Sequence, residues 1–175
     1  MNYFEFFGLP LSFQVDKAKL QRQFYQNSRQ YHPDFHTLAG ETEQEKMLEL
    51  STRNNQAWKT LSDPDRRIRY LLEIKGLLGD ETSQPALPQD FLLQMMDINE
   101  GLMELEFDFD TDRYAATQQS VTDLENELET GIQPILEAWT EAEGTEEQLR
   151  QVRDFYLKKR YLLRIRENLS KFAPA

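Results

Sequence analysis

His32-Pro33-Asp34 is the segment of this chain whose residue types and spacing could do chemistry. An imidazole and a carboxylate two positions apart can exchange protons or bind a metal ion, and His36 would add a third ligand. However, this spacing through a proline-bearing turn converges poorly on one ion, and no fourth ligand is evident. The sequence also offers no nucleophile, oxyanion hole or phosphate-binding loop. A histidine-dependent metal hydrolase therefore stays as the alternative to a binding function.

The same three residues are well suited to contact another protein. Proline pushes the preceding residue out of the right-handed helical region, so the helix before it should end near Tyr31. His32 and Asp34 then lie on an exposed connection, where binding residues are found more often than elsewhere. Because proline also fixes the loop, docking would cost less ordering entropy. The alternative without a binding function is an ordinary turn beside a basic helix that only faces solvent. In the binding interpretation, the bases of that helix steer an acidic partner toward the bend.

Apolar residues recur at three- and four-residue intervals along the chain, which predicts an all-α fold. In residues 1–75, capping and stop signals separate four helices. Asn2 caps a short first helix, and Asn54 is a polar member of the apolar stripe of the third. The other predicted bounds are Lys17 to Tyr31 after the cap Asp16, Glu41 to Leu61, and a helix that begins at Asp63-Pro64 and stops at Gly76.

Residues 76–87 are largely polar and contain proline, so they are predicted to form a linker. Residues 88–172 are predicted to form a three-helix bundle. Its first helix extends from Pro88 to about Glu106, and the next begins near Thr111 or Asp112 and continues through Trp139. A capping box at Thr145 starts the last helix.

The apolar residues of the helix after Pro88 cover much more than one face, so one flank must be buried twice or left exposed. Leu92, Leu93 and Met96 form this ambiguous flank. They belong either to the bundle core or to an exposed apolar patch, which would be a binding site. Tyr161 is likewise either half-buried structure or a contact residue. The acidic residues that would border the patch are Asp97, Glu100 and Glu104.

The 175 residues include no cysteine, which excludes disulfides, thiolate catalysis and thiolate-bound iron–sulfur clusters. The net charge of −11 is unevenly distributed: residues 1–75 carry 11 basic and 10 acidic side chains, and residues 76–175 carry 9 and 21. A chain of this kind is a poor nucleic-acid binder. Its basic segment 148–171 should pack along the acidic helices before it. With no secretory signal or apolar run long enough to span a membrane, a cytoplasmic protein is expected.

Several segments resemble a known family. The basic helix ending in Tyr31-His32-Pro33-Asp34 and the later run Asn55 to Leu61 (NQAWKTL) are similar to a J-domain. The run Asp63 to Leu72 is similar to the fourth-helix region of such domains. More narrowly, Tyr3 to Pro10 and the bundle after a short linker resemble the HscB family, the J-type co-chaperones of iron–sulfur cluster assembly. The resemblance extends over nearly the whole chain, with an N-terminal J-domain and a C-terminal three-helix bundle.

The resemblance implies a function in binding, without catalysis or a cofactor. J-domains dock on the ATPase portion of a DnaK-type chaperone and stimulate ATP hydrolysis, and HscB-like proteins deliver the scaffold protein IscU to the chaperone HscA. The implied chaperone-binding residues are His32, Pro33, Asp34, Arg22, Gln26 and Arg29. The implied scaffold-binding residues are Leu92, Leu93, Met96, Asp97, Glu100, Glu104 and Tyr161. A J-domain protein with a different client is the alternative within this class.

Two departures from the family pattern concern the docking surface. Many J-domains have a basic residue after the tripeptide, whereas Phe35 stands here. Gln21, Gln26 and Gln30 likewise occupy positions where bases are often found. The resemblance therefore implies a surface that is either weaker or tuned to a particular partner.

Overall fold

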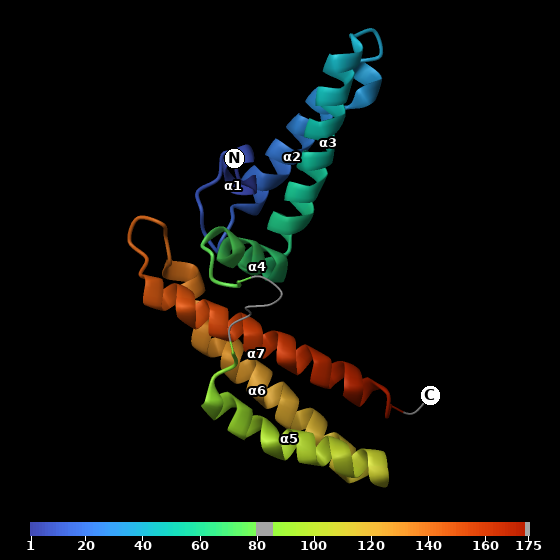
Figure 1. Cartoon of the computed structure of the whole chain (residues 1–175), viewed down its shortest axis with the longest axis vertical. Coiled ribbons are helices and arrows are strands. Elements are labelled where there is room, and N and C mark those ends of the chain that lie inside the picture. The colour runs from blue at the N-terminus through green and yellow to red at the C-terminus, as the bar shows by residue number, and fades with distance from the viewer. Residues whose placement is uncertain (80–85, 174–175) are drawn as a thin grey trace. The chain divides into compact units, whose positions relative to one another are not determined.

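The computed structural model of the chain describes residues 1–79 and 86–173, which contain helices and no strand. The predicted all-α class is therefore confirmed (Figure 1). Part of the predicted linker, residues 80–85, lies outside the described residues. The elements are α1 (Tyr3–Phe6), α2 (Lys17–Tyr31), the short 3-10 turn η1 (Pro33–Phe35), α3 (Glu41–Ser62), α4 (Pro64–Ile74), α5 (Gln89–Phe107), α6 (Thr111–Ala138) and α7 (Glu146–Ser170).

The helix ends follow from local capping chemistry. The carboxylate of Asp16 accepts the backbone N–H of Lys19 at 3.0 Å, and the carboxylate of Asp63 accepts that of Arg66 at 2.9 Å. Thr145 begins α7 with the predicted capping box, in which its side chain and that of Gln148 each bond the other's backbone N–H. These side chains satisfy N–H groups that have no partner inside a helix.

The chain divides into two compact units, each described here by itself. The first comprises Met1–Gly76 together with the short segment Trp139–Glu143. The second comprises the described residues of Leu77–Ala138 and Gly144–Ala175. The division into functional domains at 1–75 and 88–172 remains a prediction.

In the first unit, α2 and α3 lie side by side and form a helical hairpin (Figure 1). Two asparagines are buried between them: Asn27 Nδ2 donates to Asn54 Oδ1 at 3.2 Å. Asn54 Nδ2 in turn lies 3.2 Å from the Phe24 carbonyl oxygen and 3.1 Å from Ser28 Oγ. The predicted polar member of the α3 stripe is thus a hydrogen-bonded link between the two helices, as burial of an amide requires.

The buried side chain of Arg67 connects the segment before α2 with the end of α3. Arg67 Nε donates to the Phe13 carbonyl at 2.8 Å and one terminal nitrogen donates to the Leu61 carbonyl at 2.6 Å. Burial lowers the pKa of the Arg67 guanidinium below its ordinary value, and the nearby carboxylate of Asp63 offsets part of this effect. The guanidinium therefore joins the segment before α2 to the junction of α3 and α4, around an apolar core of Phe4, Phe7, Leu9, Phe13, Leu20, Ala57, Leu61, Ile68, Leu71 and Leu72.

The prediction for Trp139 was wrong. Helix α6 ends at Ala138, and Trp139 belongs to the first unit, where its buried ring lies 5.3 Å from that of Phe13. In the same unit, Lys75 Nζ forms an ion pair with the Glu141 carboxylate at 2.7 Å. The apolar spacing of α6 includes Trp139, and for this reason the helix was predicted to contain it. Spacing alone does not show which core the indole enters.

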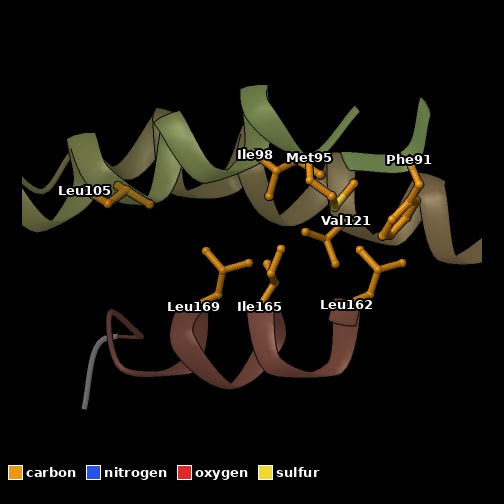
Figure 2. Close-up of a cluster of buried hydrophobic side chains, with 8 residues drawn as sticks. All are labelled: Phe91, Met95, Ile98, Leu105, Val121, Leu162, Ile165 and Leu169. Atoms are coloured by element: carbon orange, nitrogen blue, oxygen red, sulfur yellow. The ribbon is translucent and has the colours of Figure 1, made fainter. Parts of the chain in front are cut away.

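The second unit is a bundle of α5, α6 and α7. Figure 2 shows Leu162, Ile165 and Leu169 of α7 facing the apolar side chains of the other two helices. The core residues opposite them are Phe91, Met95, Ile98 and Leu105 of α5 and Val121 of α6. As predicted, the basic last helix packs along an acidic one: Arg166 Nε lies 2.8 Å from Glu125, and Lys159 Nζ lies 2.6 Å from Glu129. The bond to Glu125 raises the pKa of Arg166.

Helices α5 and α6 approach closely at Gly101. A Cβ added at this glycine would lie 2.8 Å from Thr117 Oγ1, a buried side chain of α6. Glycine is a poor residue for a helix interior, so its presence in α5 reflects this close approach. None of the described helices has both the length and the apolar character needed to cross a membrane.

Candidate functional site

The His-Pro-Asp segment forms an exposed bend at the end of α2. His32 ends the helix with φ −65° and ψ 127°, the extended conformation that a following proline imposes. Its Nδ1 accepts the backbone N–H of Asp34 at 3.2 Å, so a neutral ring carries its proton on Nε2. The side chains of His32 and Asp34 are 52% and 85% exposed. Both are therefore accessible to another molecule, which a docking role requires.

Residues after the bend hold its shape. His36 Nε2 lies 2.8 Å from the Gln30 carbonyl oxygen, which ties the loop back to α2. The Gln44 side-chain amide donates to three loop carbonyls, those of His36, Thr37 and Ala39, at 3.1, 3.2 and 3.1 Å. Because His36 has this structural partner, it is poorly placed as a metal ligand. Within residues 1–79 and 86–173, no group of three or more His, Asp or Glu side chains could hold a metal ion.

The exposed face of α2 next to the bend is cationic and contains an aromatic side chain. The predicted contacts Arg22, Gln26 and Arg29 are all exposed and line one shallow depression. Gln30, one of the predicted departures on this surface, lines the same depression. Tyr25 lines it too, and sequence reasoning missed this residue. Tyr25 lies outside the apolar stripe of α2, and an aromatic residue off the stripe was the available signal.

The ambiguous flank of α5 is exposed. Leu92, Leu93 and Met96 retain 43%, 60% and 61% of their accessible surface, so they are not part of the bundle core. The core is instead built from the opposite side of α5 (Figure 2). The acidic residues predicted to border the patch, Asp97, Glu100 and Glu104, are exposed on the same helix. Glu104 also forms an ion pair with Arg113 at 2.9 Å.

Tyr161 is half-buried beside α5. Its hydroxyl oxygen accepts a hydrogen bond from Asn99 Nδ2 at 2.9 Å, and its ring meets the edge of Phe91 with centroids 5.7 Å apart. The residue therefore has a structural role in holding α7 against α5. Part of its ring stays accessible, and its contact with a partner remains a prediction.

Sequence reasoning missed two further exposed residues of α5. Met103 and Phe107 are 70% and 97% exposed, more than the three predicted apolar contacts. They lie eleven and fifteen positions after Leu92, a spacing that places all of them on one helical face. That spacing was the signal from which they could have been predicted.

The helical hairpin with its exposed His-Pro-Asp bend, followed by a helical bundle, defines a J-type co-chaperone. Residues 87–170 match the family described as HSCB C-terminal oligomerisation domain. The HscB co-chaperone homologue of Psychromonas ingrahamii is 34% identical, with 90% of this chain and 92% of the relative covered. That of Aeromonas hydrophila is 31% identical, with 98% and 96% covered. The chain belongs to the HscB family of co-chaperones.

Solved structures agree with this assignment. The crystal structure of human co-chaperone protein HscB superposes with a TM-score of 0.71 at 29% identity, covering 98% of this chain and 81% of that one. The chaperone HscB from Vibrio cholerae gives a TM-score of 0.65 at 25% identity, covering 98% and 96%. The similarity therefore extends over both units of the chain.

Proposed function

We propose that this chain docks on the ATPase portion of the DnaK-type chaperone HscA and presents the iron–sulfur scaffold protein IscU to it. The first unit would stimulate ATP hydrolysis, and the second would hold the scaffold protein. The observation that carries this proposal is the exposed His32-Pro33-Asp34 bend, held in shape by its own loop. A second exposed surface, on α5 of the other unit, supports the binding of a separate partner.

The chemistry of the first surface fits an acidic partner. The exposed guanidinium groups of Arg22 and Arg29 flank a polar and aromatic depression on α2. Cationic groups near the rim of an interface speed association and orient the partner more than they tighten the complex. His32 and Asp34 then supply short, directional hydrogen bonds. Pro33 and the Gln44 contacts reduce the entropy that docking would cost.

The chemistry of the second surface fits a folded protein with an apolar patch. Leu92, Leu93 and Met96 together form an exposed apolar area, and methionine adapts easily to the shape of a partner. The chain contains no cysteine, so it would escort a cluster-bearing scaffold without supplying thiolate ligands to the cluster. The proposed role is therefore one of binding and delivery, with the chemistry left to the chaperone.

The test is an ATPase assay of HscA with and without IscU, combined with calorimetric titration of IscU. His32→Gln should abolish stimulation of the ATPase while the affinity for IscU is unchanged, because the bend loses its imidazole and the α5 surface is untouched. Triple alanine at Leu92, Leu93 and Met96 should have the opposite effect. It should lose IscU binding and keep a folded bundle, since all three side chains are exposed.

Circular dichroism supplies the control for both variants, whose helical signal should equal that of the parent chain. Undiminished ATPase stimulation by His32→Gln would refute docking through the bend. Unchanged IscU binding by the triple variant would refute the α5 assignment. Binding to another protein in place of IscU would favour a J-domain protein with a different client.

A further inference from the structure

The exposed apolar face of α5 continues well beyond the predicted contacts. Leu92, Met96, Met103 and Phe107 lie on one side of the helix, at spacings of four, seven and four residues. At about 1.5 Å per residue, this face is about 22 Å long. Phe107 is 97% exposed in the last turn of α5, where its ring contributes nothing to the bundle core. A large aromatic side chain fully exposed at the end of an apolar face is typical of a contact residue.

The turn after α5 adds a second, better-ordered aromatic ring. Phe109 is half-exposed, and its ring lies 5.9 Å from that of Tyr114 in α6. Asp110 fixes the turn, because its carboxylate accepts the backbone N–H of Arg113 at 2.8 Å and its carbonyl accepts that of Tyr114 at 2.9 Å. The backbone at the junction that carries the two phenylalanines is thus ordered, so little backbone entropy is lost when they are covered.

Acidic side chains surround this end of the helix. Residues 97–112 contain seven acidic residues and no basic one. Arg113 pairs with one of them, Glu104, and the other carboxylates form an extended negative field. The seven residues are Asp97, Glu100, Glu104, Glu106, Asp108, Asp110 and Asp112.

The charge determines which partner fits. A symmetric contact with the same face of a second copy would bring two such acidic fields together, which opposes association. On the basic helix α7 of a second copy, Arg166 and Lys159 are already paired with Glu125 and Glu129 of their own chain, so fewer of its bases are available to this surface. A different protein that carries apolar side chains bordered by lysine or arginine fits both properties of the surface.

We propose that Met103, Phe107 and Phe109 form a second contact region for the scaffold protein, which meets them with apolar side chains bordered by lysine or arginine. This inference rests on the proposed function, because the region continues the α5 face that carries Leu92 and Met96. The N-terminal half of α5 would supply aliphatic contacts, and its C-terminal end would supply aromatic contacts within an acidic border. The border would add to the rate of association and make binding dependent on salt.

The test is calorimetric titration of IscU into the full chain and its variants. The pair Met103→Ser and Phe107→Ser should weaken binding about tenfold or more, as loss of a buried aromatic contact commonly does. Leu163→Ser is the matched control, because Leu163 of α7 is 56% exposed in the same unit and lies outside the α5 face. It should leave the affinity unchanged. All the replaced side chains are exposed, so thermal unfolding should match that of the parent chain.

The acidic border is tested separately with Glu106→Gln and Asp108→Asn, which remove charge and keep the shape of the side chains. This pair should weaken binding at low salt and flatten the dependence of affinity on salt concentration. Binding that has the same salt dependence as the parent chain would overturn the electrostatic part of the inference.

The outcomes separate this inference from the proposed function. If the parent chain binds IscU, the triple alanine variant loses binding and the Met103 and Phe107 pair binds normally, the second contact region is refuted and the proposed function stands. If the parent chain does not bind IscU, the proposed function itself fails. Sedimentation of the chain alone measures its oligomeric state. If the chain is a dimer and Phe107→Ser converts it to a monomer, a second copy covers this surface and the inference is overturned.

Discussion

His32 is held by the backbone turn that it helps to form. Its Nδ1 accepts the N–H of Asp34, and the neutral ring therefore offers the Nε2 proton as a donor to another molecule. The carboxylate of Asp34, 85% exposed, offers an acceptor two residues away. One short bend thus presents both kinds of hydrogen-bonding group, and Pro33 limits the conformations that either group can adopt.

Asn54 links α3 to α2 inside the hairpin that carries this bend, and its replacement should lower stability. Asn54→Leu keeps the branched shape of the side chain but leaves the buried amide of Asn27 without its acceptor. We expect the free energy of unfolding to fall by about 1–3 kcal/mol, the usual cost of an unsatisfied buried polar group. Urea unfolding followed by tryptophan fluorescence measures this directly, because both tryptophans, Trp58 and Trp139, belong to the first unit.

The double variant Asn27→Leu and Asn54→Leu is the control for this interpretation. With both amides replaced by apolar groups, neither asparagine is left unpaired, and the half-buried amide of Gln23, which donates to Asn27, can turn to water. The loss of stability should therefore be smaller than for Asn54→Leu alone. If the double variant loses more free energy of unfolding than the two single variants lose together, the asparagines contribute something other than pairing with each other.

Helix α5 illustrates how one element can serve two surfaces. Its buried side packs on α6 and α7, and its exposed side carries the proposed contacts.

Gly101 permits the close approach of α5 to α6. Gly101→Ala should therefore lower the free energy of unfolding by about 1–2 kcal/mol through the clash with Thr117 Oγ1, despite the better helix propensity of alanine. Urea unfolding followed by far-ultraviolet circular dichroism measures the change, with the tryptophan signal of the first unit as an internal reference.

Thr117→Ala provides the matched background for this prediction. Once Thr117 Oγ1 is removed, the nearest remaining atom of that side chain, its Cβ, lies at an ordinary contact distance of 3.8 Å from the added methyl group. In that background Gly101→Ala should stabilise the bundle by about 1 kcal/mol, because only the helix-propensity effect remains. If Gly101→Ala has the same effect in both backgrounds, the close approach does not explain the glycine.

The helices were predictable because their signals are local. Asp16, Asp63 and Thr145 cap the helices that they precede, and His32 ends α2 where the proline rule places it. The same local rules identified the bend and the basic helix beside it, which form the first candidate surface. Local chemistry therefore defines most of the element bounds and one of the two surfaces.

The remaining features depend on packing between distant residues. Periodicity showed that α5 is apolar on too many sides, but only the positions of α6 and α7 decide that Phe91 is buried and Leu92 is exposed. The burial of Arg67 was equally hidden, because its partners are carbonyl groups of Phe13 and Leu61, whose positions no side-chain pattern reveals. Exposed Phe107 is a different case, because its spacing from Leu92 along α5 was a local signal that the sequence did offer.

The two units carry surfaces of different character. Residues 1–75 have nearly balanced charge and a cationic helix face, whereas residues 76–175 have 9 basic and 21 acidic side chains. Each surface thus suits a different partner. Because one chain carries both surfaces, the proposed function would keep a protein held on α5 at high effective concentration near a chaperone bound to α2.

This linkage predicts the behaviour of a mixture. An equimolar mixture of His32→Gln with the triple alanine variant contains both intact surfaces on separate molecules. It should not restore the extra stimulation of the HscA ATPase that IscU produces with the parent chain, because no molecule joins the two partners. The ATPase assay at fixed total protein measures this result. Full restoration by the mixture would show that the two surfaces need not be covalently joined.

The three hydrogen bonds from Gln44 to the loop after the bend have a consequence for turnover. Because the loop is shaped in the free protein, the proposed docking would need no refolding of the loop on release, and the loop would be ready at once for the next encounter. Contact through a few side chains then allows a short residence time. Under the proposed docking, one molecule of this protein would therefore serve many chaperone cycles.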